Sequence, residues 1–215
     1  MSNRNANLIQ CRRKVLKTLA SPLYNSSASG NPSIPQHAVG DYILAIGVAP
    51  TSATIPTLTG FGSPLLAEAV GPQSYAVYGM VASSADHTIA WTGVGGASIR
   101  AVWVFPGGAQ LDTLNASNGT SAALVFETQP TMTPDSLLGA YVLTNTAQTN
   151  IATPLAATIT AGVAQRAIRN AVPANWVGDT NTGRLSAFGG AGLNGTFDTA
   201  PSRWSAIVFS MKAPA

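Results

Sequence analysis

The sequence predicts an all-β protein, built as a β-sandwich or a β-barrel. From residue 38 onward, short apolar runs alternate with turn residues, and glycine-containing turns such as Asn118-Gly119 and Asn194-Gly195 separate several of the runs. Regularly spaced short runs of this kind are typical of sandwiches and barrels. A second observation is that one sequence pattern occurs twice, and a third is that positive charge concentrates before residue 25.

The apolar runs give the expected strands in chain order. Hydrophobic residues dominate each run, and turn-forming residues bound it. The segment Gln165-Arg166-Ala167-Ile168-Arg169 is also compatible with a helix, and the sequence leaves that alternative open. The expected strands are 41–49, 65–70, 74–82, 87–92, 98–105, 121–126, 136–143, 155–160, 163–168, 184–188 and 203–211.

The repeated pattern predicts two related halves, at about residues 38–110 and 111–215. Each half starts with a turn aspartate before an apolar strand, at Asp41 and at Asp135. Each half ends with an arginine that leads a tryptophan-containing apolar strand, at Arg100 and at Arg203. A pattern that recurs at this interval is what a fold made of two similar units would produce.

Composition favours a protein that packs against other subunits. The chain of 215 residues is 46% hydrophobic but only 9% charged, whereas ordinary soluble domains carry about 25% charged residues. Its surface must therefore be covered mainly by small and uncharged polar side chains. We expect a homo-oligomer or a subunit of a larger assembly.

Charge is distributed unevenly. Five of the 11 basic residues lie in residues 1–24, which contain no acid, so the rest of the chain has 6 basic and 8 acidic residues and a net charge of −2. A nearly neutral body argues against a nucleic-acid-binding surface on the main domain. The single cysteine, Cys11, rules out an intramolecular disulfide and a cysteine-based metal site. No apolar run has the length of a membrane span, and we expect no secretory signal, because Arg12, Arg13, Lys14 and Lys17 interrupt the first apolar stretch.

Residues 1–37 are predicted to form an anchoring arm and a linker. Apolar residues recur at helical spacing between residues 7 and 20, which indicates a short basic amphipathic helix ended by Pro22, and the polar residues 24–36 are typical of an extended linker. One hypothesis is that the cations bind nucleic acid or another anionic surface. We favour the alternative, in which the arm docks on a neighbouring subunit. The anchoring residues would be Leu8, Ile9, Arg12, Arg13, Lys14, Leu16, Lys17 and Leu19.

Candidate catalytic and metal-binding groups are sparse, and we predict no catalytic site, metal site or cofactor. His37 and His87, with Asp41 or Asp86 and one of the many serines, are the groups from which a nucleophile, a base and an orienting acid would have to come. No Gly-x-Ser-x-Gly turn supports this. Glu68 and Glu127 are the only glutamates. Both are expected to face solvent.

The arginines and tryptophans are interpreted mainly as structural. Arg100 and Arg203 are expected to satisfy loop carbonyls or to pair with the turn residues Asp41 and Asp135, although contact with a ligand is the alternative. Trp103 and Trp204 lie inside apolar strands and are predicted to be core residues. The candidate for an exposed aromatic that contacts a ligand is Trp176.

Several of these motifs together resemble a jelly-roll-like domain found in bacteriophage virion and tail proteins. They are Gly40-Asp41 before an apolar run, a Pro-containing loop that ends in Gly60-Phe61, the strand Tyr75-Ala76-Val77-Tyr78, and Trp91 at the end of a loop. In that family a tryptophan usually stands at the position of Phe61 and a lysine at the position of Gly79. The resemblance covers residues 38–214, and the second half shares only its two ends.

The resemblance implies a jelly-roll-like antiparallel β-sandwich and a structural role in a virion assembled in the host bacterial cytoplasm. The chain would be a capsid decoration or head-fibre subunit, or part of a tail or tail fibre, bound to other virion subunits through its arm. One alternative is a module that binds a host-surface glycan or receptor through Trp176. A hydrolase is a further alternative, which the residues favour less.

Overall fold

The computed structural model describes residues 22–27, 30–49, 52–71, 73–93, 99–124, 137–144, 151–152, 159–161, 169–171, 176–185, 195–197, 200 and 203–214. Every element in these residues is a β-strand, and all strand pairs are antiparallel, which confirms the all-β class. The predicted helix at residues 7–20, with the arm residues Leu8, Ile9, Arg12, Arg13, Lys14, Leu16, Lys17 and Leu19, lies outside the described residues, as does Asp135.

The first part of the chain forms a five-stranded sheet, which we call sheet I. Its strands lie in the order β1-β7-β2-β5-β4. In chain order they are β1 (Leu23–Ser27), β2 (Tyr42–Ala49), β4 (Leu66–Val70), β5 (Gln73–Val81) and β7 (Ile99–Phe105).

The second part of the chain forms sheet II, in the order β12-β14-β10-β16-β8, with β13 (Arg169–Ala171) paired to one end of β14. In chain order its strands are β8 (Gln110–Gly119), β10 (Leu137–Thr144), β12 (Ile159–Ala161), β14 (Trp176–Leu185) and β16 (Trp204–Lys212).

The two sheets share one strand order. When the five main strands of each sheet are numbered along the chain, both sheets read first, fifth, second, fourth, third from one edge to the other. Each sheet therefore comes from one continuous part of the chain. The two antiparallel sheets fit the expected β-sandwich, and the jelly-roll-like connectivity stays a prediction.

A short turn at residues 106–109 carries the chain from sheet I to sheet II. Gly107 and Gly108 both have positive φ angles, 77° and 74°, a conformation that favours glycine. The predicted boundary between the halves, at residues 110 and 111, falls at the start of β8.

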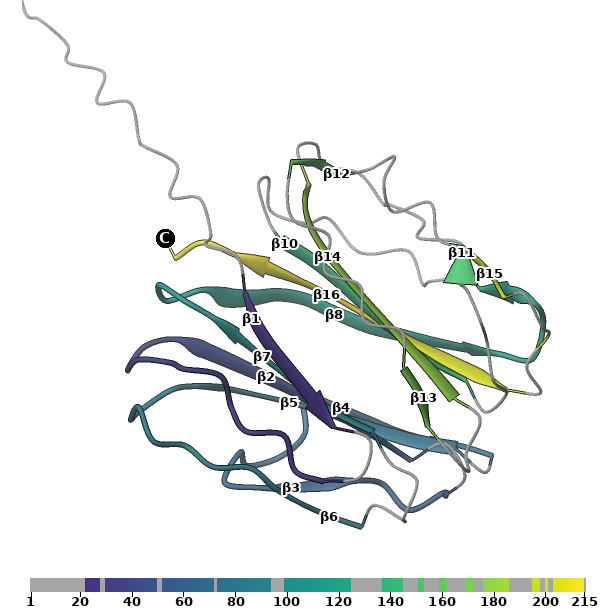
Figure 1. Ribbon diagram of the computed structural model, residues 1–215, viewed down its shortest axis with the longest axis horizontal. Coiled ribbons are helices and arrows are strands. Elements are labelled where there is room, and N and C mark those ends of the chain that lie inside the picture. Colours follow the sequence, from purple (N-terminus) through teal and green to yellow (C-terminus); the bar gives the residue numbers. More distant parts are fainter. Residues whose placement is uncertain are drawn as a thin grey trace, which may run out of the picture.

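The main core lies between the two sheets and joins them into a sandwich (Figure 1). Trp103 and Phe105 on β7 pack edge to face against Phe209 on β16, with ring centroids 5.6 and 6.0 Å apart. All three rings are at most 1% exposed. Burial of side chains of this size stabilises the fold by about 1.5 to 3 kcal/mol each. The core residues are Leu44, Ile46, Val48, Tyr75, Val77, Ala101, Trp103, Phe105, Ala109, Ile207, Phe209 and Met211.

Sheet I is also covered on its outer face, where a two-stranded sheet of β3 (Thr57–Thr59) and β6 (Ala90–Thr92) lies below it in Figure 1. Ile43 and Ala45 point into this second core together with Leu58 and Trp91, while Leu44 points into the main core. This explains why β2 reads as an unbroken apolar run rather than an alternating one. A further small sheet of β9 (Ala123–Leu124), β11 (Ile151–Ala152) and β15 (Gly195–Phe197) lies above sheet II (Figure 1).

The structure corrects the expected linker at residues 24–36. Leu23–Ser27 is β1, which pairs along its whole length with β7 and forms the edge of sheet I. The Tyr24 ring packs 5.0 Å from the Trp103 ring, measured between centroids. The folded body therefore includes residues that the sequence assigned to the arm. A short polar strand reads like a loop because only one of its edges and one of its faces are covered.

Candidate functional site

The two histidines come together at one end of the body. His37 precedes β2, His87 lies in the loop between β5 and β6, and their ring centroids are 5.5 Å apart. His37 Nδ1 lies 2.9 Å from the carbonyl oxygen of Pro35, and His87 Nδ1 lies 3.0 Å from that of Ser84. Because a carbonyl oxygen only accepts hydrogen bonds, each of these contacts is a hydrogen bond when Nδ1 of the ring carries a proton.

One serine lies beside this pair. Ser83 Oγ is 3.4 Å from His87 Nε2, a long contact at an exposed position. The carboxyl group expected to orient the histidine is not there. Asp86 is exposed, and Asp41 accepts its hydrogen bonds from backbone amides. In the described part of the chain, no three His, Cys, Asp or Glu side chains are grouped so that they could hold a metal ion. These residues therefore supply a serine and a histidine without the third member of a triad.

Asp41 holds together the start of β2 and the turn between the sheets. It is 9% exposed. Its Oδ2 accepts a hydrogen bond from the amide of Ala38 at 2.8 Å, and its Oδ1 accepts one from the amide of Gly107 at 3.0 Å. The predicted role as a turn residue is thus confirmed and extended, because the same carboxylate also binds the link from sheet I to sheet II.

Arg100 makes a contact that differs from the expected one. The strand register places it opposite Gly47, at the far end of β2 from Asp41. Its guanidinium donates a hydrogen bond to Oδ1 of Asn31 at 3.2 Å, and the same oxygen accepts the amide of Trp91 at 3.2 Å. Burial lowers the pKa of Arg100. The arginine therefore joins β7 to the segment after β1 and to β6, and it does not pair with Asp41.

Arg203 lies just before β16 and packs against the turn between β4 and β5. A Cβ atom added to Gly71 would be 3.1 Å from Nε and 3.2 Å from Cζ of Arg203. The guanidinium thus covers a glycine of sheet I from the start of a strand in sheet II. The predicted pairing with Asp135 falls outside the described residues.

Three of the four tryptophans are buried and hold the layers together. Trp91 is 6% exposed, and its ring lies on Gly47 and edge to face against Tyr78 at 5.6 Å. Trp204 is 3% exposed, lies on Gly119 of the neighbouring strand β8 and donates a hydrogen bond from Nε1 to the carbonyl of Ser121 at 3.2 Å. With Trp103 fully buried, the predicted core positions of Trp103 and Trp204 are confirmed. None of these three rings offers a free face for stacking on a sugar.

Trp176, the candidate ligand-contacting residue, is the first residue of β14 and pairs with Ala171 of β13. Its backbone therefore belongs to sheet II. Contact between its side chain and a ligand stays a prediction.

Two polar links between the sheets were not anticipated from the sequence. Glu68 on β4 is exposed, as expected, but its Oε2 accepts hydrogen bonds from the Tyr75 hydroxyl at 2.6 Å and from the Asn118 amide on β8 at 3.0 Å. Inside the sandwich, Ser205 Oγ on β16 donates to Gln73 Oε1 on β5 at 3.1 Å, with both side chains at most 1% exposed. The partners are 50 and 132 residues apart in the chain, so local sequence carries no signal of either link.

Comparison of this chain with protein-family models, curated proteins and solved structures finds no match. Within the described residues, no helix is long and apolar enough to cross a membrane.

Proposed function

We propose that this chain is a structural component of a bacteriophage-like virion. The sandwich is displayed on the particle, and the basic segment before β1 attaches it to neighbouring subunits. The observation that carries this proposal is that the polar and aromatic side chains make structural contacts within the body. Asp41, Glu68, Arg100 and Trp204, which could have formed a binding or catalytic site, instead connect strands, turns and layers. A body stiffened in this way suits a load-bearing subunit.

Charge and composition support the same role. The body from residue 25 onward has 6 basic and 8 acidic residues, and five cations precede it. Copies of a nearly neutral body can approach one another closely with little repulsion, while a flanking cationic segment provides a separate point of attachment. Several weak attachments on a symmetric particle act together, so that modest affinity per copy gives durable binding. Capsid decoration or head-fibre subunits and tail or tail-fibre subunits would both use this arrangement.

We also infer that the sandwich consists of two copies of one structural unit. The support is the common strand order of the two sheets, in which β1, β2, β4, β5 and β7 correspond to β8, β10, β12, β14 and β16. The small sheets follow the same scheme, because β3 pairs with β6 and β11 pairs with β15 at corresponding places in the chain. An experimental structure tests this inference. If the five main strands of the two sheets failed to superimpose in that correspondence, the halves would be unrelated.

The virion role is tested by following the protein during particle assembly. Particles produced in cells that carry the gene are purified on a density gradient and probed with antibody against the body. We expect the full-length chain at a constant ratio to the major particle protein. The same chain without residues 1–21 should be folded but missing from the particles.

Two results would contradict the proposal. Absence of the full-length chain from purified particles would contradict the virion role, and normal incorporation of the truncated chain would contradict attachment through residues 1–21. Glycan binding that is lost in Trp176→Ala, with incorporation unchanged, would instead support the receptor-binding alternative.

A further inference from the structure

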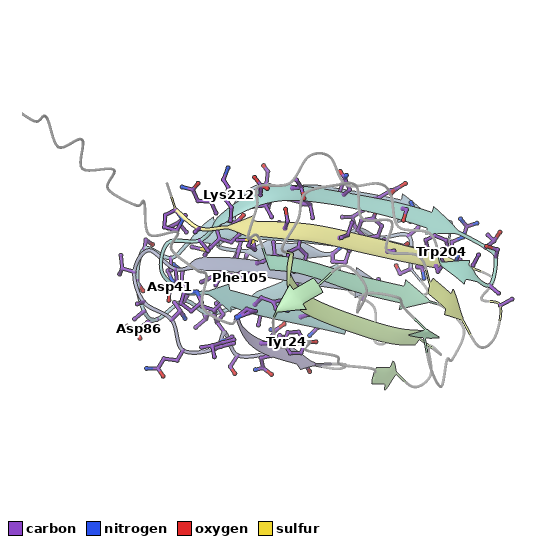
Figure 2. The ribbon with its side chains drawn as sticks, turned by 90° about the horizontal axis from the view of Figure 1, so that it is seen from above. Tyr24, Asp41, Asp86, Phe105, Trp204 and Lys212 are labelled. Carbon is purple, nitrogen blue, oxygen red and sulfur yellow. The ribbon has the colours of Figure 1, made fainter. Side chains whose placement is uncertain are left out.

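Residues 1–21 join the body at one particular end of sheet I. The strand register aligns Leu23 on β1 with Val104 on β7, Val104 with Ile43 on β2, and Ile43 with Met80 on β5. The start of β1, the start of β2 and the end of β5 therefore lie side by side. We call this the N-proximal end of the body. Asp41 and Asp86 lie at this end, and Trp204 lies at the opposite end (Figure 2).

Exposed apolar side chains gather at the same end. Val39 is 70% exposed, Val81 is 59% exposed and Leu65 is 46% exposed, the three highest values among the large hydrophobic residues of the described chain. The amide of Gly40 donates a hydrogen bond to the carbonyl of Ala82 at 2.8 Å, which holds the turn that carries Val39 against the residue that follows β5.

Leu65 and Val81 form one surface with Tyr42. A Cβ atom added to Gly79 would meet both Leu65 and the Tyr42 hydroxyl, so the two side chains flank that glycine. Val81 lies two residues further along β5, on the same face, and is paired with Tyr42 across the strands. We define the end patch as Tyr42, Leu65 and Val81 together with Val39 on the turn at the same end. Among the residues whose burial the structure describes, few large hydrophobic side chains are exposed, and an apolar surface of this kind is typical of an interaction site.

The segment before β1 has the chemistry to cover this patch. Its predicted helix places Leu8, Cys11, Val15 and Leu19 three or four residues apart, which puts them on one apolar face. Its cations match the exposed carboxylate of Asp86, which follows β5 at the same end. From the start of β1, the patch on β2 and β5 is two to three strand spacings away, or about 10 to 15 Å. A helix of fourteen residues would span about 21 Å, which is enough to cross it.

Pro22 favours docking of the segment on a second copy over docking on its own body. Proline disfavours the helical conformation in the residue before it and biases that residue towards an extended one. We therefore expect the segment before Pro22 to continue away from the end of its own body rather than to turn back over it. When two copies face each other across a two-fold axis, the departure point and the receiving surface must lie on the same end of each copy, as they do here.

We propose that residues 7–20 of one copy dock on the end patch of a second copy, so that two chains exchange their N-terminal segments. This inference rests on the proposed anchoring role of residues 1–21 and specifies what they bind. The arrangement buries both apolar surfaces and leaves the cations of the segment at the rim, next to Asp86. Facing pairs would then be the building unit from which a larger particle is assembled.

Disulfide trapping tests the proposal in the purified full-length protein, without any particle. Cys11 is the only cysteine and lies on the predicted docking face, so Val81→Cys and Val39→Cys each add one possible partner. A disulfide requires the two Cα atoms to lie within about 7 Å of each other. Under mild oxidation we expect both variants to shift from the 21.9 kDa chain to a reducible band of twice that mass, with peptide 11 joined to peptide 39 or 81.

The matched control is Ile55→Cys. Ile55 is also an exposed apolar residue, at 40%, but it adjoins Thr54, whose carbonyl binds Ser74 at the opposite end of β5. This variant should not cross-link through Cys11. Adding Cys11→Ser to Val81→Cys or to Val39→Cys should remove the dimer band, which separates docking of the segment from contact between two patches.

Other outcomes overturn the proposal. A bond from Cys11 to residue 39 or 81 within one chain would show that the segment covers its own body. Equal dimer formation by Ile55→Cys, or no bond at residues 39 and 81, would show that the patch does not receive the segment. Because this assay uses no particles, it can fail while the virion role holds, and the particle assay can fail while the exchange holds.

Discussion

The close contact between Gly47 and Trp91 offers a sharp test of how the outer layer packs on sheet I. A Cβ atom added to Gly47 in the middle of β2 would lie 2.7 Å from Cη2 and 2.8 Å from Cε3 of the Trp91 ring, and closer still to Cζ3. Real Cβ atoms do not approach other atoms so closely. In Gly47→Ala the indole, which is 6% exposed, would therefore have to move away from the sheet.

The expected cost follows from overpacking. Forcing a methyl group into a well-packed core typically costs about 1 to 3 kcal/mol. For a chain of this length each kcal/mol lowers the melting temperature by about 2 to 4 °C, so Gly47→Ala should melt roughly 2 to 12 °C below the wild type. The edge-to-face contact of Trp91 with Tyr78, now 5.6 Å between ring centroids, should loosen at the same time.

A double-mutant cycle isolates the contact, with urea unfolding as the assay. Trp91→Ala alone should cost about 3 to 5 kcal/mol, because it leaves a large cavity. In that background Gly47→Ala meets no ring. It should then be neutral or stabilising by about 0.5 to 1 kcal/mol, because alanine loses less backbone entropy than glycine in a strand.

The cycle compares the effect of Gly47→Ala on the free energy of unfolding in the presence and in the absence of the Trp91 ring. If Gly47→Ala destabilised the Trp91→Ala protein as much as the wild type, the clash with the indole would not be the cause. A wild-type melting temperature for Gly47→Ala would show that Trp91 does not rest on the sheet at that position.

Three further predictions address the turn between the sheets, the ionisation of Tyr42 and the start of the body. Asp41→Ala should lower the free energy of unfolding by about 1 to 3 kcal/mol for each backbone amide that it leaves unsatisfied, one of them that of Gly107; an unchanged urea midpoint would contradict this. Burial raises the pKa of Tyr42 above its ordinary value of 10.0, so its contribution to stability is fully present below pH 10 and is lost as the pH rises through the raised pKa. Tyr42→Phe should remove that part of the alkaline loss, which urea titrations between pH 8 and pH 11 measure. Removing residues 1–21 should leave the urea midpoint unchanged, whereas removing residues 1–24 should lower stability by at least about 0.5 to 1.5 kcal/mol, because Tyr24 no longer packs on Trp103; equal stability of the two truncated chains would show that β1 contributes nothing.

Strands buried on both faces were predictable from the sequence. The expected strands at 41–49, 74–82, 98–105, 136–143 and 203–211 each agree with an observed strand to within one residue at either end. For β2, β5 and β7 the reason is that the main core covers one face and the outer core covers the other. A strand with both faces buried has to be apolar throughout, so its sequence reveals it.

Polar strands were missed for the opposite reason. The sequence predicts a linker where Leu23–Ser27 forms β1, and it predicts no strand over most of Gln110–Gly119 and Trp176–Leu185. The last of these strands, β14, nevertheless occupies an interior position in sheet II. These segments are rich in Asn, Ser, Thr, Asp and Gly, which also dominate loops. What makes them strands is the backbone pairing offered by neighbours such as β7 and β16, distant in sequence, and such pairing leaves no local pattern.

For the candidate site, the sequence predicted the roles of single residues but not the contacts between them. The sequence identified Asp41 as a turn residue and Trp103 and Trp204 as core residues. It did not indicate that Asp41 also binds the turn at Gly107, nor that Arg100 reaches Asn31 instead of an aspartate. Each of these contacts depends on the register between strands.

By itself, the sequence determined the all-β class, the apolar strands, and the separation of a cationic segment from a nearly neutral body, because local hydrophobic pattern and charge count need no partner to be recognised. Tertiary structure alone decided that each sheet comes from one continuous part of the chain, that β1 belongs to the body, and that the exposed side chains of Val39, Leu65 and Val81 lie at the same end of the body as the start of β1. The physical reason is that strand order and register are set by hydrogen bonds between segments far apart in the chain. Those bonds use the backbone groups that every residue type carries.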